Sequence, residues 1–139
     1  MGLILDTIIY SDIVFEQYKL NDDTKNFIAE QKDLYITIPT LWELSNHVRK
    51  GTYQIDLPFD EYFKLVNKNL DIKVLPMSWA AMNWLSVTPY ITAFEKPHKD
   101  TFDRMIIAHA IVNNLPIISK DNAFPFYESV GLISCHVRY

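Results

Sequence analysis

Short apolar runs alternate with longer, helix-patterned segments along this chain of 139 residues. Such runs, bounded by polar or turn-forming residues, are typical of buried strands in a parallel sheet. The expected strands are residues 3–5, 34–38, 72–75 and 116–119, with a final edge strand at 132–137. The expected helices are residues 7–14, 24–31, 39–50, 59–69, 78–86 and 102–113, with a loop at 89–99 and a turn-rich stretch at 121–127. This alternation predicts an α/β sandwich around a mostly parallel sheet of four to five strands.

The composition fits one folded domain that spans residues 1–139. Hydrophobic residues make up 49% and charged residues 22%, which excludes a disordered chain. The single cysteine, Cys135, cannot form an internal disulfide, and Asp6 interrupts the only early apolar run that a signal peptide would need. No apolar run approaches the ~20 residues of a membrane span. We therefore expect a cytoplasmic protein, and its net charge of -4 argues against a passive nucleic-acid binder.

Four acidic residues fall at expected junctions between strands and helices. Asp6 ends the first strand, and Glu43 is expected in the first turn of the helix after the second strand. Asp103 lies in the first turn of the late helix, and Asp121 follows the fourth strand. In a parallel α/β sheet, the carboxyl ends of the strands and the amino ends of the helices share one edge, where ligands bind. The four acids are therefore expected to be neighbours in space.

Each acid also has an ordinary structural explanation. Asp6 and Asp100 are suitable helix N-caps, and an acid one turn into a helix, such as Asp103, is favoured by the helix dipole. The segment from Thr40 to Glu43 fits a capping box, and Asp121 starts a turn-forming Asp-Asn pair. Considered singly, each acid is explained by capping or turn formation.

Two observations favour a metal site over capping alone. Asp103 begins an apolar stripe that continues through Ile106, Ile107 and Ala110, so its side chain faces the core. In addition, four carboxylates at one sheet edge would repel one another, and a divalent cation would remove this penalty. Short oxygen ligands suit Mg²⁺ or Mn²⁺. Such a site indicates phosphoester hydrolysis by a metal-activated water.

Four segments follow one another in a specific order along nearly the whole chain: LILDT at 3–7, TLWELSNHVRKG at 40–51, HKDTFDRMIIAHA at 98–110 and LPIISKDNAF at 115–124. Together they resemble PIN-domain ribonucleases, specifically the VapC-like toxins of type II toxin–antitoxin systems. Ile8 stands where relatives typically carry a histidine, Thr101 stands where they often carry a proline, and His109 replaces the usual glutamine. None of these departures removes a carboxylate.

The resemblance implies a PIN-like three-layer sandwich and an endoribonuclease that depends on Mg²⁺ or Mn²⁺. It places Asp6, Glu43, Asp103 and Asp121 on the acidic residues of the family. The implied products carry a 5′-phosphate and a 3′-hydroxyl. The implied partners are an RNA substrate, a cognate antitoxin that blocks the site, and a second copy of the toxin in a homodimer.

Several residues near the acids are candidates to hold the acids in place or to contact the substrate. Asp100 is either an outer acid of the site or an N-cap, and Thr7 and Ser119 are expected to hydrogen-bond to acids or to act only in structure. Arg104 is expected to contact a phosphate or acid, or to form a surface salt bridge. His98 precedes the acids in a loop, but a lone histidine is weak evidence for a site.

Other functions remain to be weighed. A Rossmann dinucleotide binder is excluded because the chain has three glycines and no G-x-G-x-x-G. A phosphoryl-accepting aspartate protein, phosphatase-like or receiver-like, would use Asp6 in an acidic pocket, although Ile8 stands where the phosphatases carry a second aspartate. A third alternative is a PIN-fold interaction module without activity, against which the intact set of acids argues.

Overall fold

The computed structural model describes residues 2–136, and its centre is a five-stranded sheet whose paired strands all run parallel. The strands lie in the order β3-β2-β1-β6-β7. Their bounds are β1 Gly2–Leu5, β2 Asp33–Thr37, β3 Ile72–Leu75, β6 Ile117–Ser119 and β7 Ser134–His136. The predicted α/β class and parallel sheet are confirmed. Val137, the last residue of the expected edge strand, lies outside the described residues.

The expected helices form close to their predicted positions. They are α1 Thr7–Phe15, α2 Asp22–Ala29, α3 Ile38–Arg49, α4 Phe59–Leu70, α5 Trp79–Val87 and α6 Thr101–Val112. Two 3₁₀ helices are also present: η1 Gln17–Lys19 lies between α1 and α2, and η2 Phe124–Val130 lies between β6 and β7. In the described part of the chain, no helix is both long and apolar enough to cross a membrane.

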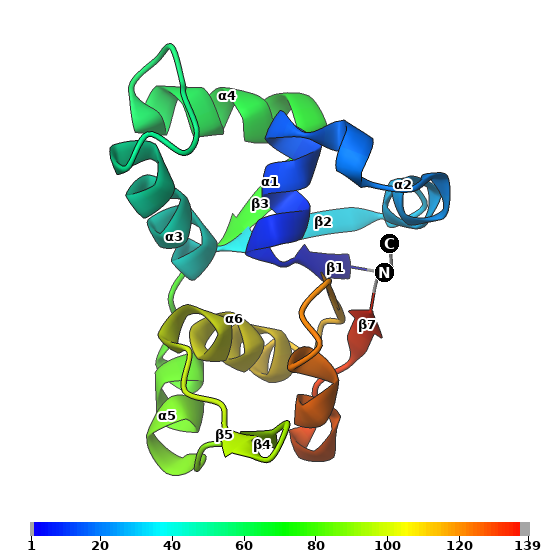
Figure 1. Ribbon diagram of the computed structural model, residues 1–139, viewed down its shortest axis with the longest axis vertical. Helices are drawn as coiled ribbons and strands as arrows, with labels where there is room; N and C mark the ends of the chain where they lie inside the picture. The colour runs from blue at the N-terminus through cyan, green and yellow to red at the C-terminus, as the bar shows by residue number, and fades with distance from the viewer. Residues whose placement is uncertain (1, 137–139) are drawn as a thin grey trace.

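Helices cover both faces of the sheet, which gives the three layers that were predicted (Figure 1). Leu3 and Leu5 of β1 pack in one core with residues of α1, α2, α3 and α4. Ile4, which points to the opposite face, packs in the second core with α6 and η2. Because both faces of β1 are buried, the strand is a continuous apolar run rather than an alternating one.

The start of α3 differs from the prediction. The helix begins at Ile38, with Thr37 as its N-cap residue and Pro39 in the first turn. Thr40 is therefore a helical residue, and the predicted capping box from Thr40 to Glu43 is wrong. Glu43 lies in the second turn of α3, because proline is tolerated in the first turn and the N-cap residue lies three positions earlier than the capping box suggested.

Two further segments are more ordered than their sequence suggested. Residues 89–99, expected to be a loop, contain a small antiparallel ribbon of β4 Thr92–Ala93 and β5 Lys96–Pro97. Phe94 and Glu95 make its turn with positive φ angles of 52° and 65°, a conformation that sequence rules assign to glycine or asparagine. The stretch after β6, expected to be rich in turns at 121–127, forms the 3₁₀ helix η2.

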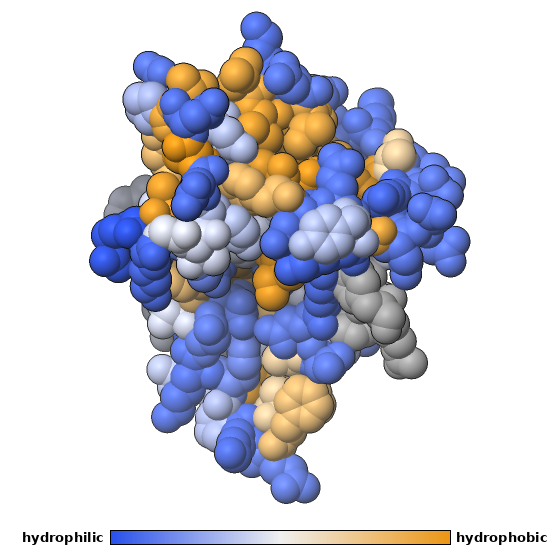
Figure 2. All heavy atoms as spheres, turned by 45° about the horizontal axis from the view of Figure 1, so that its top comes forward, coloured by the Kyte–Doolittle hydropathy of each residue, from blue (hydrophilic) through white to orange (hydrophobic). Residues whose placement is uncertain are grey.

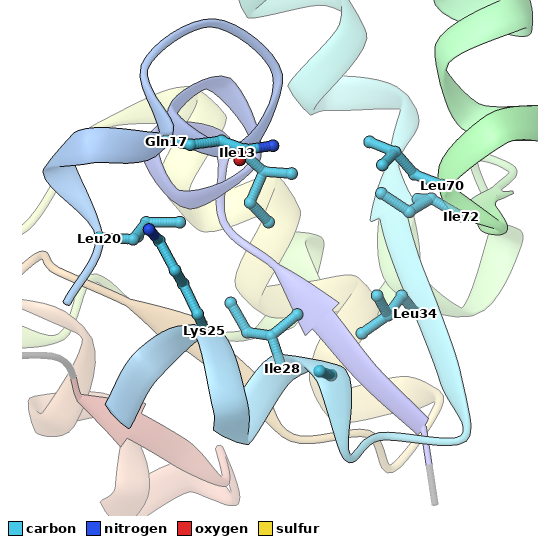
Figure 3. A pocket seen from close by; sticks show the side chains of 9 residues that line it. Ile13, Gln17, Leu20, Lys25, Ile28, Leu34, Leu70 and Ile72 are labelled. Atoms are coloured by element: carbon cyan, nitrogen blue, oxygen red, sulfur yellow. The ribbon is translucent and has the colours of Figure 1, made fainter. Parts of the chain in front are cut away.

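An apolar groove opens where α1, α2 and α4 approach one another. One part of it, about 280 Å³, is lined by nine residues, eight of which Figure 3 labels, including Ile13, Ile28, Leu34, Leu70 and Ile72. A second hollow of about 220 Å³ lies toward α4 and shares Ile13, Gln17 and Leu70 with the first. Figure 2 shows apolar surface on this side of the molecule, framed by hydrophilic side chains. We call the two joined hollows the α1–α2–α4 groove.

Candidate metal centre at the carboxyl edge of the sheet

The side chain of Asp6 is held at the junction between β1 and α1. Asp6 is only 4% exposed and is the N-cap residue of α1, with its Oδ1 accepting the Thr7 backbone N–H at 2.8 Å. Its Oδ2 accepts a hydrogen bond of 2.7 Å from the Ser119 hydroxyl at the end of β6. The second bond is possible because β1 and β6 are adjacent, with Leu5 beside Ile118. The capping explanation of Asp6 is confirmed, and the same carboxylate faces the sheet edge.

Asp121 follows the next strand end. Its backbone N–H donates to the Ser119 hydroxyl at 2.9 Å, and its Oδ1 accepts the Ala123 N–H at 2.9 Å. The second bond is an aspartate turn, as the Asp-Asn pair suggested. Ser119 is completely buried, and its one hydroxyl links Asp6 to the backbone of Asp121. Ser119 was expected either to hydrogen-bond to an acid or to act only in structure, and the structure shows the hydrogen bond.

Asp103 lies in the first turn of α6, as predicted. Asp100 is the N-cap residue of this helix, and its Oδ1 accepts the Asp103 N–H at 2.9 Å. The Asp100 side chain is exposed, whereas the Asp103 side chain is only 18% exposed. The two aspartates of this segment therefore differ in position, with Asp100 capping the helix and Asp103 turned toward the other acids.

The electrostatics show that the four predicted acids are near one another. Burial raises the pKa of Asp6 from 3.8 to about 6; hydrogen bonds from Ser119 and Thr7 oppose the shift, and Glu43 and Asp121 add to it. Burial also raises the pKa of Asp103 well above its usual range, and repulsion from Asp100, Asp6 and Asp121 raises it further. Glu43 thus contributes to the cluster from the second turn of α3. The effect is what crowding of carboxylates in a partly dry site produces.

Two of the expected supporting residues make other contacts. The Thr7 hydroxyl lies 3.1 Å from the Thr40 hydroxyl, so Thr7 supports Asp6 through its backbone and not through its side chain. The Arg104 guanidinium donates to the Thr88 carbonyl at 3.1 Å and lies 4.7 Å from the centre of the Tyr90 ring. Arg104 is therefore anchored at the C-terminal end of α5 rather than in the surface salt bridge that was one alternative.

The structure places a histidine, His98, beside the acids, a position that the sequence alone did not predict. The Nε2 atom of His98 lies 3.3 Å from Oδ2 of Asp103. One ligand atom from each of His98, Asp103 and Asp121 can be chosen so that all lie within 4.8 Å of one another. His98 follows the β4–β5 ribbon, and its backbone N–H donates to the Ile91 carbonyl at 2.8 Å. Because the ribbon was not predicted, no sequence periodicity placed this residue beside Asp103.

The donor set suits a divalent cation. Carboxylate oxygens dominate it, and these are the ligands that hard cations prefer. The raised pKa values of Asp6 and Asp103 mark the same site, because a bound cation would stabilise the charged carboxylates that now repel one another. The geometry therefore fits a cation held between the ends of β1 and β6 and the start of α6.

The sequence matches the family model described as the PIN domain over residues 3–128. A search of curated proteins found no match. Among solved structures, the chain is similar to VapBC2 from Rickettsia felis bound to a promoter DNA fragment, with a TM-score of 0.70, 16% identity and 98% of each chain covered. VapBC-1 from nontypeable Haemophilus influenzae gives a TM-score of 0.69, 16% identity and 98% of each chain covered. FitAcB from Neisseria gonorrhoeae gives 0.62, 17% identity and 95% of each chain covered.

The structural similarities support the same fold, and the family match adds a functional class. PIN domains are nucleases that depend on divalent metal, which agrees with an acidic cluster at the sheet edge. The match covers most of the chain, including all four acids of that cluster. The chain therefore belongs to the PIN-domain family.

Proposed function

We propose that this single-domain protein is a metal-dependent endoribonuclease and the toxin of a toxin–antitoxin pair. The observation that carries the proposal is the convergence of acids from distant parts of the chain. Glu43 and Asp121 raise the pKa of Asp6, and Asp6 and Asp121 raise the pKa of Asp103, so the four acids act on one another at one edge of the sheet. The cluster supports the nuclease activity expected of a PIN domain.

In this proposal the four acids bind Mg²⁺ or Mn²⁺ and orient the scissile phosphate. When bound, such a cation supplies positive charge for the developing negative charge on phosphate and acidifies a nearby water. The chain itself holds the carboxylates in place: Ser119 fixes Asp6 and the Asp121 backbone, and Asp100 fixes the start of the helix that carries Asp103. Hydrolysis at this site is expected to give a 5′-phosphate and a 3′-hydroxyl.

The proposed substrate is RNA, and the proposed location is the cytoplasm. A chain with a net charge of -4 does not gain much affinity from bulk attraction to phosphates. Binding would instead depend on the cation and on local basic groups. Lys99 is one such group, because its Nζ lies 5.4 Å from the centre of the Tyr90 ring, which Arg104 also contacts.

The proposed protein partners are an antitoxin and a second copy of the chain. The solved structures that it resembles include toxin–antitoxin complexes, which supports this class of partner. The α1–α2–α4 groove is an open apolar surface of the size that a partner's side chains fill. We assign the groove to an apolar segment of the antitoxin. The homodimer follows from the family resemblance alone.

The geometry disfavours Asp6 as a phosphoryl acceptor. Both of its carboxylate oxygens already accept hydrogen bonds, and the side chain is almost completely buried. A phosphoryl group is much larger than a metal ion and must reach the carboxylate that attacks it, which the deep burial of Asp6 does not allow unless its neighbours move. This arrangement supports metal-assisted hydrolysis over the phosphoryl-acceptor alternative.

The test is cleavage of RNA by the purified protein in Mg²⁺ or Mn²⁺, with EDTA as the negative control. Asp6→Asn and Asp103→Asn are expected to abolish cleavage. Asp60→Asn is a matched control because Asp60 is an exposed residue of α4. Persistent cleavage by both site variants would exclude the acidic cluster as the catalytic site. Phosphate trapped on Asp6, without RNA cleavage, would favour the phosphoryl-acceptor alternative, and folded protein without either activity would favour an interaction module.

The partner assignment has a separate test. The chain is co-expressed with the product of a small neighbouring reading frame that encodes a DNA-binding protein, and the complex is isolated. Leu70→Glu places a charge in the groove and is expected to release the partner, whereas the exposed Leu65→Glu of the same helix is not. Equal binding by both variants would exclude the groove as the antitoxin site.

A further inference from the structure

His98 brings a nitrogen atom to a cluster that otherwise consists of carboxylates. Its side chain is 13% exposed, and its Nε2 lies 3.3 Å from Oδ2 of Asp103. Together with Asp121, these residues offer three ligand atoms within 4.8 Å of one another. Two ligands on opposite sides of an ion such as Mg²⁺ span about 4.2 Å, so a small inward movement of these side chains would let one ion contact all three.

The other ring nitrogen of His98, Nδ1, has a hydrogen-bond partner of its own. Nδ1 lies 2.6 Å from the hydroxyl of Tyr127, a residue of η2 that is completely buried. Metal-binding histidines commonly have their second nitrogen fixed in this way, which sets the tautomer and the orientation of the ring.

The Tyr127 hydroxyl is positioned to accept a hydrogen bond from Nδ1 of His98. The positive charge of Arg104 acts on this hydroxyl and opposes the rise in the pKa of Tyr127 that burial causes. A phenol oxygen can accept a hydrogen bond, so it is available for an N–H from His98. A neutral imidazole that carries its proton on Nδ1 presents the Nε2 lone pair to the acidic cluster.

We propose that His98 is a direct Nε2 ligand of the divalent cation, sharing it with Asp103 and Asp121, and that this nitrogen makes the site prefer Mn²⁺ over Mg²⁺. The inference rests on the proposed metal site. Mg²⁺ strongly prefers oxygen ligands, whereas Mn²⁺ accepts a mixture of imidazole and carboxylate. The chain therefore uses the β4–β5 ribbon to add a ligand from outside the sheet edge.

The test is pulsed electron paramagnetic resonance of Mn²⁺ bound to the purified protein, which detects nitrogen-14 nuclei bonded to the ion. Wild-type protein is expected to show coupling to a directly bound nitrogen. His98→Asn is expected to lose that coupling and to weaken Mn²⁺ binding by about tenfold or more, as removal of metal-supporting groups commonly does. Mg²⁺ binding, measured by calorimetry, is expected to change less than threefold, on the order of the ligand preferences above.

His47→Asn is the matched control. His47 lies near the end of α3, where its ring contacts Tyr53, and it should leave the nitrogen coupling unchanged. The wild-type measurement does not depend on how any variant folds. Mn²⁺ that binds without nitrogen coupling, while RNA cleavage persists, would overturn the histidine ligand and leave the proposed function intact. Coupling that survives in His98→Asn would also overturn it, and failure of Mn²⁺ to bind at all would remove both proposals.

Discussion

Ser119 and Asp6, which are 113 positions apart in sequence, are joined by a buried hydrogen bond of 2.7 Å. The same Ser119 oxygen accepts the backbone N–H of Asp121. One hydroxyl thus fixes the relative position of two strand ends and of the acids that follow them. In the proposed nuclease, small movements of these carboxylates would misplace the ligands of the cation.

Ser119→Ala is expected to reduce RNA cleavage by about 10- to 100-fold. The variant removes a hydrogen bond to a carboxylate and leaves a backbone N–H without its acceptor, a loss of roughly 1–3 kcal/mol. The measurement is the rate of cleavage at saturating Mn²⁺. Ser129→Ala is the control, because the Ser129 hydroxyl is exposed and donates only to the Phe126 carbonyl. An unchanged rate in Ser119→Ala would show that the backbone alone positions Asp6.

The stability of the metal-free protein is expected to fall as pH rises. The pKa of Asp6 is raised in the folded state from 3.8 to about 6, so folding favours the protonated acid. Its contribution is complete below about pH 4 and is lost as pH rises through about 6, by roughly 3 kcal/mol. Urea unfolding in EDTA at pH 4 and pH 8 measures this change.

Asp6→Asn supplies the comparison for that experiment. The variant has no titrating group at this position, so the wild type is expected to lose stability relative to it between the two pH values. Divalent cation should restore the wild type at pH 8 and have little effect on the variant, because the cation binds the ionised carboxylate. A difference between the two proteins that does not change with pH would contradict the assigned pKa shift.

Lys120→Met is expected to destabilise the protein by about 3–5 kcal/mol. Lys120 forms a salt bridge with Asp12 of α1, whose side chain is only 4% exposed, and the variant leaves that carboxylate without its cation. The free energy of unfolding is measured in urea at pH 7. Asp12→Leu together with Lys120→Met should recover much of the loss, since neither member of this pair then carries a charge.

The surface pair between Lys73 and Asp33 provides the control for this salt bridge. Its atoms are 3.2 Å apart, but the Lys73 side chain is 60% exposed. Lys73→Met is expected to leave the free energy of unfolding nearly unchanged, because solvent screens the pair. Equal effects of the two lysine substitutions would show that burial of Asp12 does not determine the loss in free energy of unfolding.

Two substitutions of Asp100 separate its capping role from a role in the metal site. Asp100→Ser keeps a side-chain acceptor for the Asp103 N–H, whereas Asp100→Ala removes it. If Asp100 acts as a cap, the alanine variant loses about 1 kcal/mol of stability and the serine variant retains both stability and cleavage. Loss of cleavage in the stable serine variant would instead show that the metal site needs the negative charge of Asp100. Thermal unfolding and RNA cleavage are measured on the same samples.

The order of strands and helices was predictable because each buried strand is a short apolar run with helical segments on both sides. The β4–β5 ribbon was not predictable, since Phe94 and Glu95 form its turn in a backbone conformation that these residue types seldom adopt. The start of α3 was misplaced for a related reason. Pro39 was taken as the first helical residue, yet Ile38 precedes it in the helix and shifts Glu43 into the second turn.

For the site, sequence spacing identified acids but not their neighbours. The apolar stripe that Asp103 begins predicted that its side chain faces inward, as the structure shows, whereas the cap formed by Asp100 was one of two alternatives. The contacts of His98 with Asp103 and of Ser119 with Asp6 depend on tertiary packing, and neither follows from a local pattern. The roles of the acids in metal binding and catalysis remain predictions that the variants above will test.

The pairing of β1 with β6 also has a consequence for the protein during its synthesis. Asp6 is made first, but its partner Ser119 is added 113 residues later. At ~5–20 residues per second, translation of the intervening chain takes about 6–23 seconds. Through this interval the growing chain lacks β6, Asp121 and, for most of it, α6. In the proposed nuclease the acidic cluster is complete only after Asp121 has been added, so a nascent chain that has not reached this residue is not expected to cleave the RNA of the ribosome that is making it.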